Sequence, residues 1–136
     1  PVDDNVSAYL RMGDSSGIDS GSTDYEYFGH SARASASSDV LFNSSGATFI
    51  KMNSGGIGGA TGEGVVFSLS LLRPGDGELR PSVVGMAATQ ATDGVLAAGS
   101  IVGQRRAVIV LDRIQFLFSA GNIATGRLSV FGHKHT

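Results

Sequence analysis

Cysteine is absent from the 136 residues of this chain. Its absence excludes disulfides, thiolate nucleophiles and cysteine-based zinc sites. Charged residues are also scarce, at 16% of the chain, compared with roughly 25% in an average soluble domain. The formal net charge is −2 and no long Lys/Arg run is present, so little electrostatic attraction to nucleic acid is available. We therefore expect no nucleic-acid partner and no cofactor.

Long apolar runs and helical patterns are missing as well. No run reaches the roughly 18–20 apolar residues of a membrane span, and the acidic start Pro1-Val-Asp-Asp-Asn5 is unlike a signal peptide. We expect no membrane partner. No stretch of a dozen residues keeps apolar side chains at helical spacing, so we predict little or no helix. Removal of an initiator Met would leave Pro1, from which we expect a complete gene product.

Glycine and apolar residues dominate what is present. The chain has 20 glycines and is 41% hydrophobic, which with so low a net charge predicts a folded chain and not a disordered one. Its length fits one domain with one core. We predict a single domain over residues 1–136.

Apolar and polar residues alternate along the informative stretches, as they do in half-buried strands. The clearest case is 65–72, and 6–12 is similar. Asn43 to Gly46 has the composition of a turn. Further strands are predicted at 24–28 with a continuation toward 38, and at 40–42, 47–52, 82–88, 95–104, 107–118 and 126–132. Strands separated by turn residues at this spacing predict a single antiparallel β-sandwich, jelly-roll-like in type.

Two loops have compositions that suggest ligand binding. Residues 55–64 are glycine-rich but lead into a strand, whereas a phosphate-binding loop opens a helix. We interpret them as an interface loop that presents Ile57. Asp14, Asp19 and Asp24 lie five residues apart, which makes them candidate metal ligands, although a calcium loop has acids at alternate positions. The alternative is that they stabilise turns.

Two aromatic residues and two terminal histidines are the other candidate contacts. Tyr25 and Tyr27 share one strand face, which is either an interface or plain exposed surface, and a carbohydrate-binding platform is the further alternative. His133 and His135 point the same way in an extended chain, but no third metal ligand is identifiable, which favours an exposed tail.

Catalytic patterns are not found. His30 has no adjacent serine and aspartate that would form a triad, and no G-x-S-x-G elbow occurs. Glu26, Glu63 and Glu78 do not single out a pair of catalytic carboxylates. We therefore expect no enzymatic activity.

The segment from Asp112 to Lys134 reads DRIQFLFSAGNIATGRLSVFGHK. It resembles the C-terminal signature of small β-sandwich domains in tailed-bacteriophage virion proteins, in which a strand, a Ser-x-Gly-Asn-x-Ala-x-Gly turn and a last strand follow one another. Phe131 stands where Tyr is common. A looser similarity covers 64–75. The resemblance implies a closing hairpin in which Leu128 and Val130 pack back on the preceding strand.

A non-enzymatic virion structural protein is the function that the resemblance implies. Because the chain has room for one domain only, we expect a head decoration or cement protein and not a fibre. Its expected partners are copies of itself, as a homotrimer, and the major capsid protein, and its expected location is the virion surface after assembly in the host cytoplasm. The alternative is a tail-tip or fibre domain that binds a host carbohydrate. The predicted interface residues are Val6, Tyr25, Tyr27, Ile57, Phe131, His133 and His135.

Overall fold

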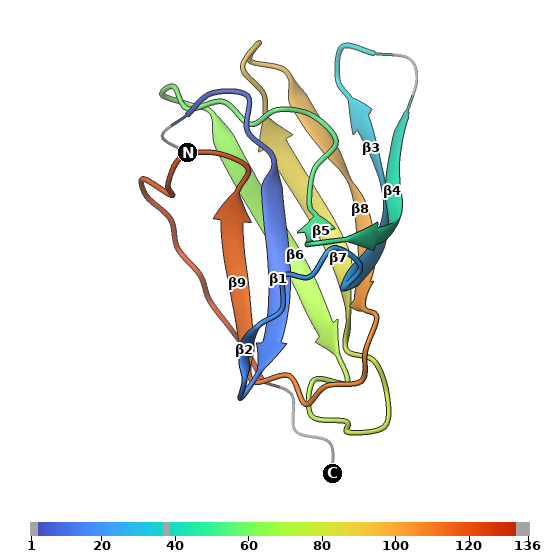
Figure 1. The fold of residues 1–136 in the computed structure, drawn as a ribbon. Coiled ribbons are helices and arrows are strands. Elements are labelled where there is room, and N and C mark those ends of the chain that lie inside the picture. The colour runs from blue at the N-terminus through green and yellow to red at the C-terminus, as the bar shows by residue number, and fades with distance from the viewer. Residues whose placement is uncertain (1–2, 37–38, 133–136) are drawn as a thin grey trace.

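The computed structural model describes residues 3–36 and 39–132. These residues form strands and loops and no helix, so none of them belongs to a helix able to span a membrane (Figure 1). The strands are β1 (Ala8–Asp14), β2 (Gly17–Ile18), β3 (Tyr25–Arg33), β4 (Val40–Ala47), β5 (Ile50–Lys51), β6 (Gly64–Leu72), β7 (Ser82–Gln90), β8 (Leu96–Arg105) and β9 (Arg113–Phe118).

The strands form two antiparallel sheets packed as a sandwich (Figure 1). The five-stranded sheet has the order β4-β3-β8-β7-β6. In the four-stranded sheet β1 is central, with β9 along one edge and the short strands β2 and β5 along the other. The predicted all-β sandwich without helix is thus confirmed.

The core lies between the sheets because one face of each strand is apolar. β1 contributes Leu10 and Met12, which are fully buried, and β7 and β8 contribute Val83 and Ile101 from the opposite sheet. Each large side chain buried in this way stabilises the fold by roughly 1.5–3 kcal/mol. The alternation read from the sequence at 6–12 therefore places Leu10 and Met12 on the core side of β1.

The predicted turn at 43–46 is wrong, because these residues belong to β4. Asn43 pairs with Phe28 and Ser44 with Tyr27, and the register between β3 and β4 shifts just beyond this point. A shift of this kind accommodates an extra residue in one strand, so turn-forming residues can remain in the sheet. The strand predicted at 47–52 is divided: Ala47 ends β4, paired with Tyr25, and Ile50–Lys51 form β5.

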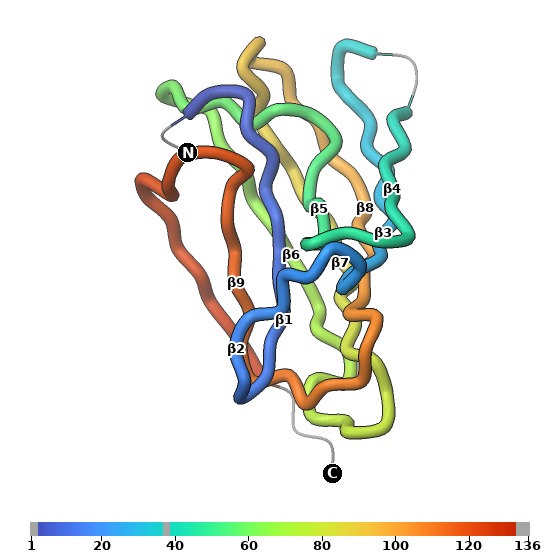
Figure 2. Tube along the Cα trace, viewed as in Figure 1, coloured from blue at the N-terminus to red at the C-terminus, as the bar shows by residue number. Residues whose placement is uncertain are grey.

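The predicted closing hairpin is also absent. Of the strand predicted at 107–118, the second half forms β9. This strand pairs with β1, from Ala8↔Phe118 to Gly13↔Arg113. Residues 126–132, the predicted last strand, have no strand partner, and 107–112 are loop. Alternation indicates which residues suit a strand, but a strand forms only where the backbone finds a partner. Figure 2 shows the path of the chain after β9.

Candidate functional site

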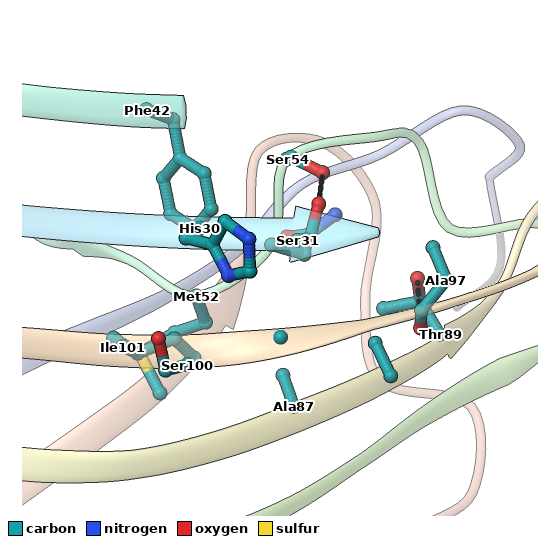
Figure 3. A pocket seen from close by; sticks show the side chains of 13 residues that line it. His30, Ser31, Phe42, Met52, Ser54, Ala87, Thr89, Ala97, Ser100 and Ile101 are labelled. Atoms are coloured by element: carbon teal, nitrogen blue, oxygen red, sulfur yellow. Dashed lines mark hydrogen bonds between the residues drawn. The ribbon is translucent and has the colours of Figure 1, made fainter. Parts of the chain in front are cut away.

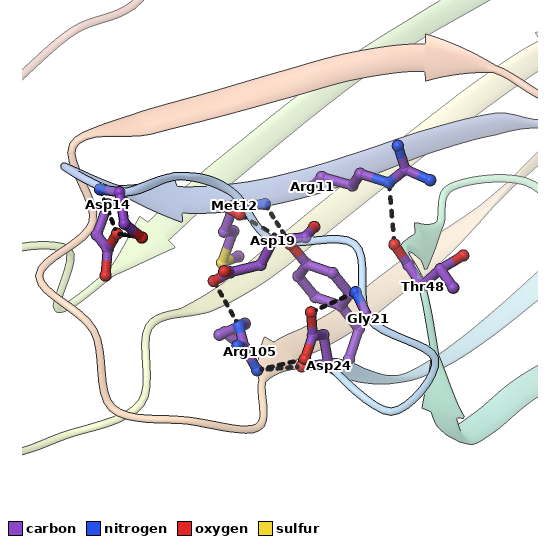
Figure 4. A network of polar contacts seen from close by, with 10 residues as sticks. Arg11, Met12, Asp14, Asp19, Gly21, Asp24, Thr48 and Arg105 are labelled. Atoms are coloured by element: carbon purple, nitrogen blue, oxygen red, sulfur yellow. Dashed lines mark hydrogen bonds and ion pairs between the residues drawn. The ribbon is translucent and has the colours of Figure 1, made fainter.

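Two of the three candidate metal ligands are held by one arginine. Arg105, at the end of β8, places its Nε 2.7 Å from Asp19 Oδ2 and its Nη1 3.3 Å from Asp24 Oδ1 (Figure 4). Nη1 also donates to the Asp24 carbonyl at 3.0 Å. The guanidinium therefore lies between these two carboxylates and compensates part of their negative charge.

Asp14, the third candidate, binds a residue of its own turn. Its carboxylate accepts hydrogen bonds from the amide and hydroxyl of Ser16 at 2.8 and 2.6 Å. These bonds lower the pKa of Asp14. It lines a shallow open hollow with Asp112, whose carboxylate is bound by Arg113 at 2.7 Å. Over residues 3–36 and 39–132, no three His, Asp or Glu side chains gather as a metal site would require. The structure thus does not bring the three aspartates together as ligands.

Tyr25 is a core residue. Its side chain is fully buried, and its hydroxyl accepts a hydrogen bond from the Met12 amide at 2.8 Å. The same hydroxyl lies 2.8 Å from the Met12 carbonyl and 2.9 Å from the Asp19 carbonyl. Burial raises the pKa of Tyr25 to about 12. Its ring cannot contact a partner or a sugar, because the sandwich covers it.

Tyr27 faces the same way as Tyr25, as the strand period predicts. It is half-buried against the core, with its ring centroid 6.4 Å from that of Phe42 and the planes tilted by 48°. Burial raises the pKa of its hydroxyl as well. The two tyrosines do share a face, but that face is the interior of the sandwich.

Val6 and Ile57 were expected at an interface, and the structure places both in the core. Val6 is 2% exposed and Ile57 is fully buried. Their backbones form an isolated bridge, with Ile57 N donating to Val6 O at 2.7 Å and Val6 N donating to Ile57 O at 3.2 Å. The glycine-rich loop is therefore fastened to the N-terminal segment at this point. His133 and His135 lie outside the described residues.

A small pocket is lined by β3, β7, β8 and the loop after β5 (Figure 3). Its volume is about 10 Å³, which is room for about one water molecule. Ser31 on its wall hydrogen-bonds to Ser54 through their hydroxyls. His30, also on the wall, pairs with Asp39 at 2.7 Å. No organic ligand fits a space of this size.

The segment 120–132, called the arm below, contains Phe131, which the sequence predicts at an interface, and Leu128 and Val130, which do not pack back on β9 as the resemblance implied. Ser119 anchors its start, because its amide donates to Ser7 O at 2.8 Å and its hydroxyl accepts from Ser7 N at 3.0 Å. From there the arm turns back at the end of β9 and, in the view drawn, descends on the outer side of β9 toward the start of that strand (Figures 1 and 2). No hydrogen bond joins it to the other residues that the structure describes. Its apolar side chains are exposed: Ile123 50%, Leu128 66%, Val130 73% and Phe131 83%.

A second exposed apolar surface was missed in the sequence. It lies on the outward side of the five-stranded sheet and includes Phe28, Leu41, Val66, Val84, Met86 and Val102, called the outer face below. The sequence contains a signal for this surface, because adjacent apolar pairs such as Val83-Val84 and Ile101-Val102 put apolar residues on both faces of a strand. Strands covered on both sides show this pattern.

Comparisons with protein-family models, with curated proteins and with solved structures find no match to this chain.

Proposed function

We propose that the chain is a non-enzymatic structural protein of a tailed-bacteriophage particle and that it decorates the surface of the head. The observation that carries this proposal is the arm. The arm includes most of the segment on which the resemblance to virion β-sandwich proteins depends, and its apolar side chains are left uncovered by the rest of the described chain. Exposed apolar surface of this kind marks a site of interaction with other molecules.

The way in which the arm binds follows from its backbone. Residues 126–132 have strand-like alternation but no strand partner. An extended segment in this state can add to the free edge of another protein's sheet, where main-chain hydrogen bonds give affinity and alternate side chains enter pockets. Leu128 and Val130 point to one side of such a strand. We assign the major capsid protein as the partner, and copies of the chain bound side by side would cover the head surface of the virion, which is assembled in the host cytoplasm.

Reconstitution on heads tests the proposal. Heads that lack the chain are prepared from the phage that encodes it, after its gene is deleted. Purified chain is then added to these heads, and its binding should saturate. The double variant Leu128→Ser/Val130→Ser removes two large apolar contacts of roughly 1.5–3 kcal/mol each, so its dissociation constant should rise at least about 100-fold. Val110→Ser is the matched control, because Val110 is 55% exposed but lies in the loop before β9.

Other binding results would overturn the head assignment. One such result is that the arm variant saturates the heads as the unchanged chain does. A second is binding to tails in place of heads. A third is binding to host-envelope glycans on an array without binding to heads. The last result would favour the tail-tip receptor function. That function lacks the platform expected for it, because Tyr25 is buried and Tyr27 faces the core.

A further inference from the structure

We infer that the outer face is a self-association surface, occupied by a second copy of this chain. The pairing register shows that apolar residues are neighbours on this side of the sheet. Phe28 pairs with Val102 and Val102 with Val84, so these three side chains form a row across β3, β8 and β7. In the next row on the same side, Met86 lies opposite Ser100. The apolar side chains are thus contiguous and central in the sheet, and not scattered.

The exposure of the outer face is unusual for a sheet in water. Antiparallel sheets with one solvated side have polar residues there, whereas here Val66 is 71% exposed, Leu41 64%, Met86 60% and Phe28 51%. The rest of this side consists largely of small or uncharged polar residues: Ala32, Ser68, Ser70, Ser82, Ala88, Ala98, Ser100 and Gln104. Small residues between larger ones leave shallow relief into which a facing surface can pack.

Charge is almost missing from this side. In the five paired strands, all of which the structure describes, the ionisable side chains on the outward positions are Glu26 and His30. Glu26 accepts a hydrogen bond from Gln104, and His30 pairs with Asp39 at 2.7 Å. A charged partner surface would therefore lose water here without gaining opposite charges. A second copy brings an equally uncharged face, so neither face leaves charges unpaired.

The size of the outer face matches a stable interface. The whole outward side of the five-stranded sheet, with its polar positions included, covers about 700 Å², because it has five strands about 4.8 Å apart and about nine residues in each at roughly 3.3 Å per residue. A standard interface buries about 800 Å² per partner. The outer face is therefore large enough to hold two copies together, with the two sheets packed face to face about 10 Å apart.

Mass measurement in solution tests the inference on the purified chain alone, so it can fail without affecting the head-binding proposal. Light scattering and native mass spectrometry should find an oligomer that dissociates on dilution. The variants Met86→Lys and Val102→Lys would bury an unpaired charge in the interface, and together they should raise the dissociation constant at least 100-fold. Val110→Lys is the matched control, exposed to a similar degree but away from this sheet, and should leave association unchanged.

Thiol protection gives a second readout that identifies the buried surface directly. Because the chain has no cysteine, Ser100→Cys places a single thiol in the middle of the outer face, and Gln115→Cys places one on the outside of the four-stranded sheet. The thiol at 100 should react with a maleimide far more slowly in the oligomer than in dilute monomer, whereas the thiol at 115 should react equally in both. A chain that stays monomeric, an oligomer that survives the two lysine substitutions, or equal reactivity at 100 in both states would overturn the inference.

Discussion

Ile50 of β5 packs against the backbone of Gly103 in β8, so closely that a Cβ at residue 103 would lie 2.7 Å from Ile50 Cγ2 and 2.9 Å from its Cδ1. The two residues belong to opposite sheets. A glycine at 103 thus lets the short strand β5 approach the five-stranded sheet and bury Ile50 completely.

The substitution Gly103→Ala should destabilise the fold. The added methyl has no free space, and overpacking of a core costs about 1–3 kcal/mol. Urea unfolding followed by circular dichroism should therefore show a lower midpoint. Gly75→Ala is the control, because nothing lies within 4 Å of a Cβ at that position, and its midpoint should stay nearly unchanged. Equal midpoints for the two variants would contradict the close contact.

Removal of Arg105 should destabilise the chain more than removal of an exposed ion pair. Its side chain is 12% exposed and bridges Asp19 and Asp24, which are each 22% exposed. Arg105→Met leaves two poorly solvated carboxylates without a counter-charge, at a cost of about 3 kcal/mol. The control Arg113→Met breaks the exposed pair with Asp112 and should cost less than about 1 kcal/mol.

A double-mutant cycle between Arg105→Met and Asp19→Asn checks that the loss comes from the bridge. The combined variant should lose less stability than the sum of the two single variants, because each removes the same interaction. Additive losses would show that the bridge does not stabilise the fold.

The bridge also shows what the sequence could and could not predict. The alternation in 65–72 gave β6 within one residue, and the strand period correctly put Tyr25 and Tyr27 on the same face. Period 2 does not say which face is inside, so the two tyrosines were assigned to an interface. Similarly, Asp19 and Arg105 are separated by 86 residues, and no local pattern connects residues so far apart.

The closing hairpin failed for a related reason. Residues 113–118 and 126–132 are near in sequence and both suit a strand, which favours pairing between them. However, β9 pairs with β1 instead, over six residue pairs between Ala8–Gly13 and Arg113–Phe118. Which partner a strand takes depends on the packing of the whole sandwich, and the residues of the hairpin alone do not contain that information.

Ionisation of Tyr25 should weaken the fold at high pH. Burial raises its pKa from 10 in the unfolded chain to about 12 in the fold. Its stabilising contribution is therefore fully present below pH 10 and is lost as the pH rises through about 12. The loss amounts to about 3 kcal/mol over that interval.

Urea unfolding across this pH interval measures the effect of Tyr25. Tyr25→Phe should start less stable by about 1–3 kcal/mol, because the Met12 amide loses its acceptor, but its stability should fall less steeply with pH. Tyrosinate absorbance should show one tyrosine of the unchanged chain ionising near pH 12. Parallel pH profiles for the two proteins would contradict the burial of the ionising hydroxyl.

Trypsin should cut the arm at Arg127 long before it cuts at Arg105 in the sandwich. Arg127 is exposed in a segment with no strand pairing, whereas Arg105 lies at the end of β8, with its amide donating to Pro81 O at 3.1 Å. Proteases need an extended, accessible backbone, which exposed loops provide and paired strands do not. Mass spectrometry of timed digests should show the fragment ending at Arg127 first.

Because the arm makes no hydrogen bond to the other described residues, a chain ended after Ala120 should keep its free energy of unfolding within about 0.5 kcal/mol. A larger loss would mean that the arm supports the fold of its own chain, and would remove the argument that its apolar side chains are free to bind a neighbour.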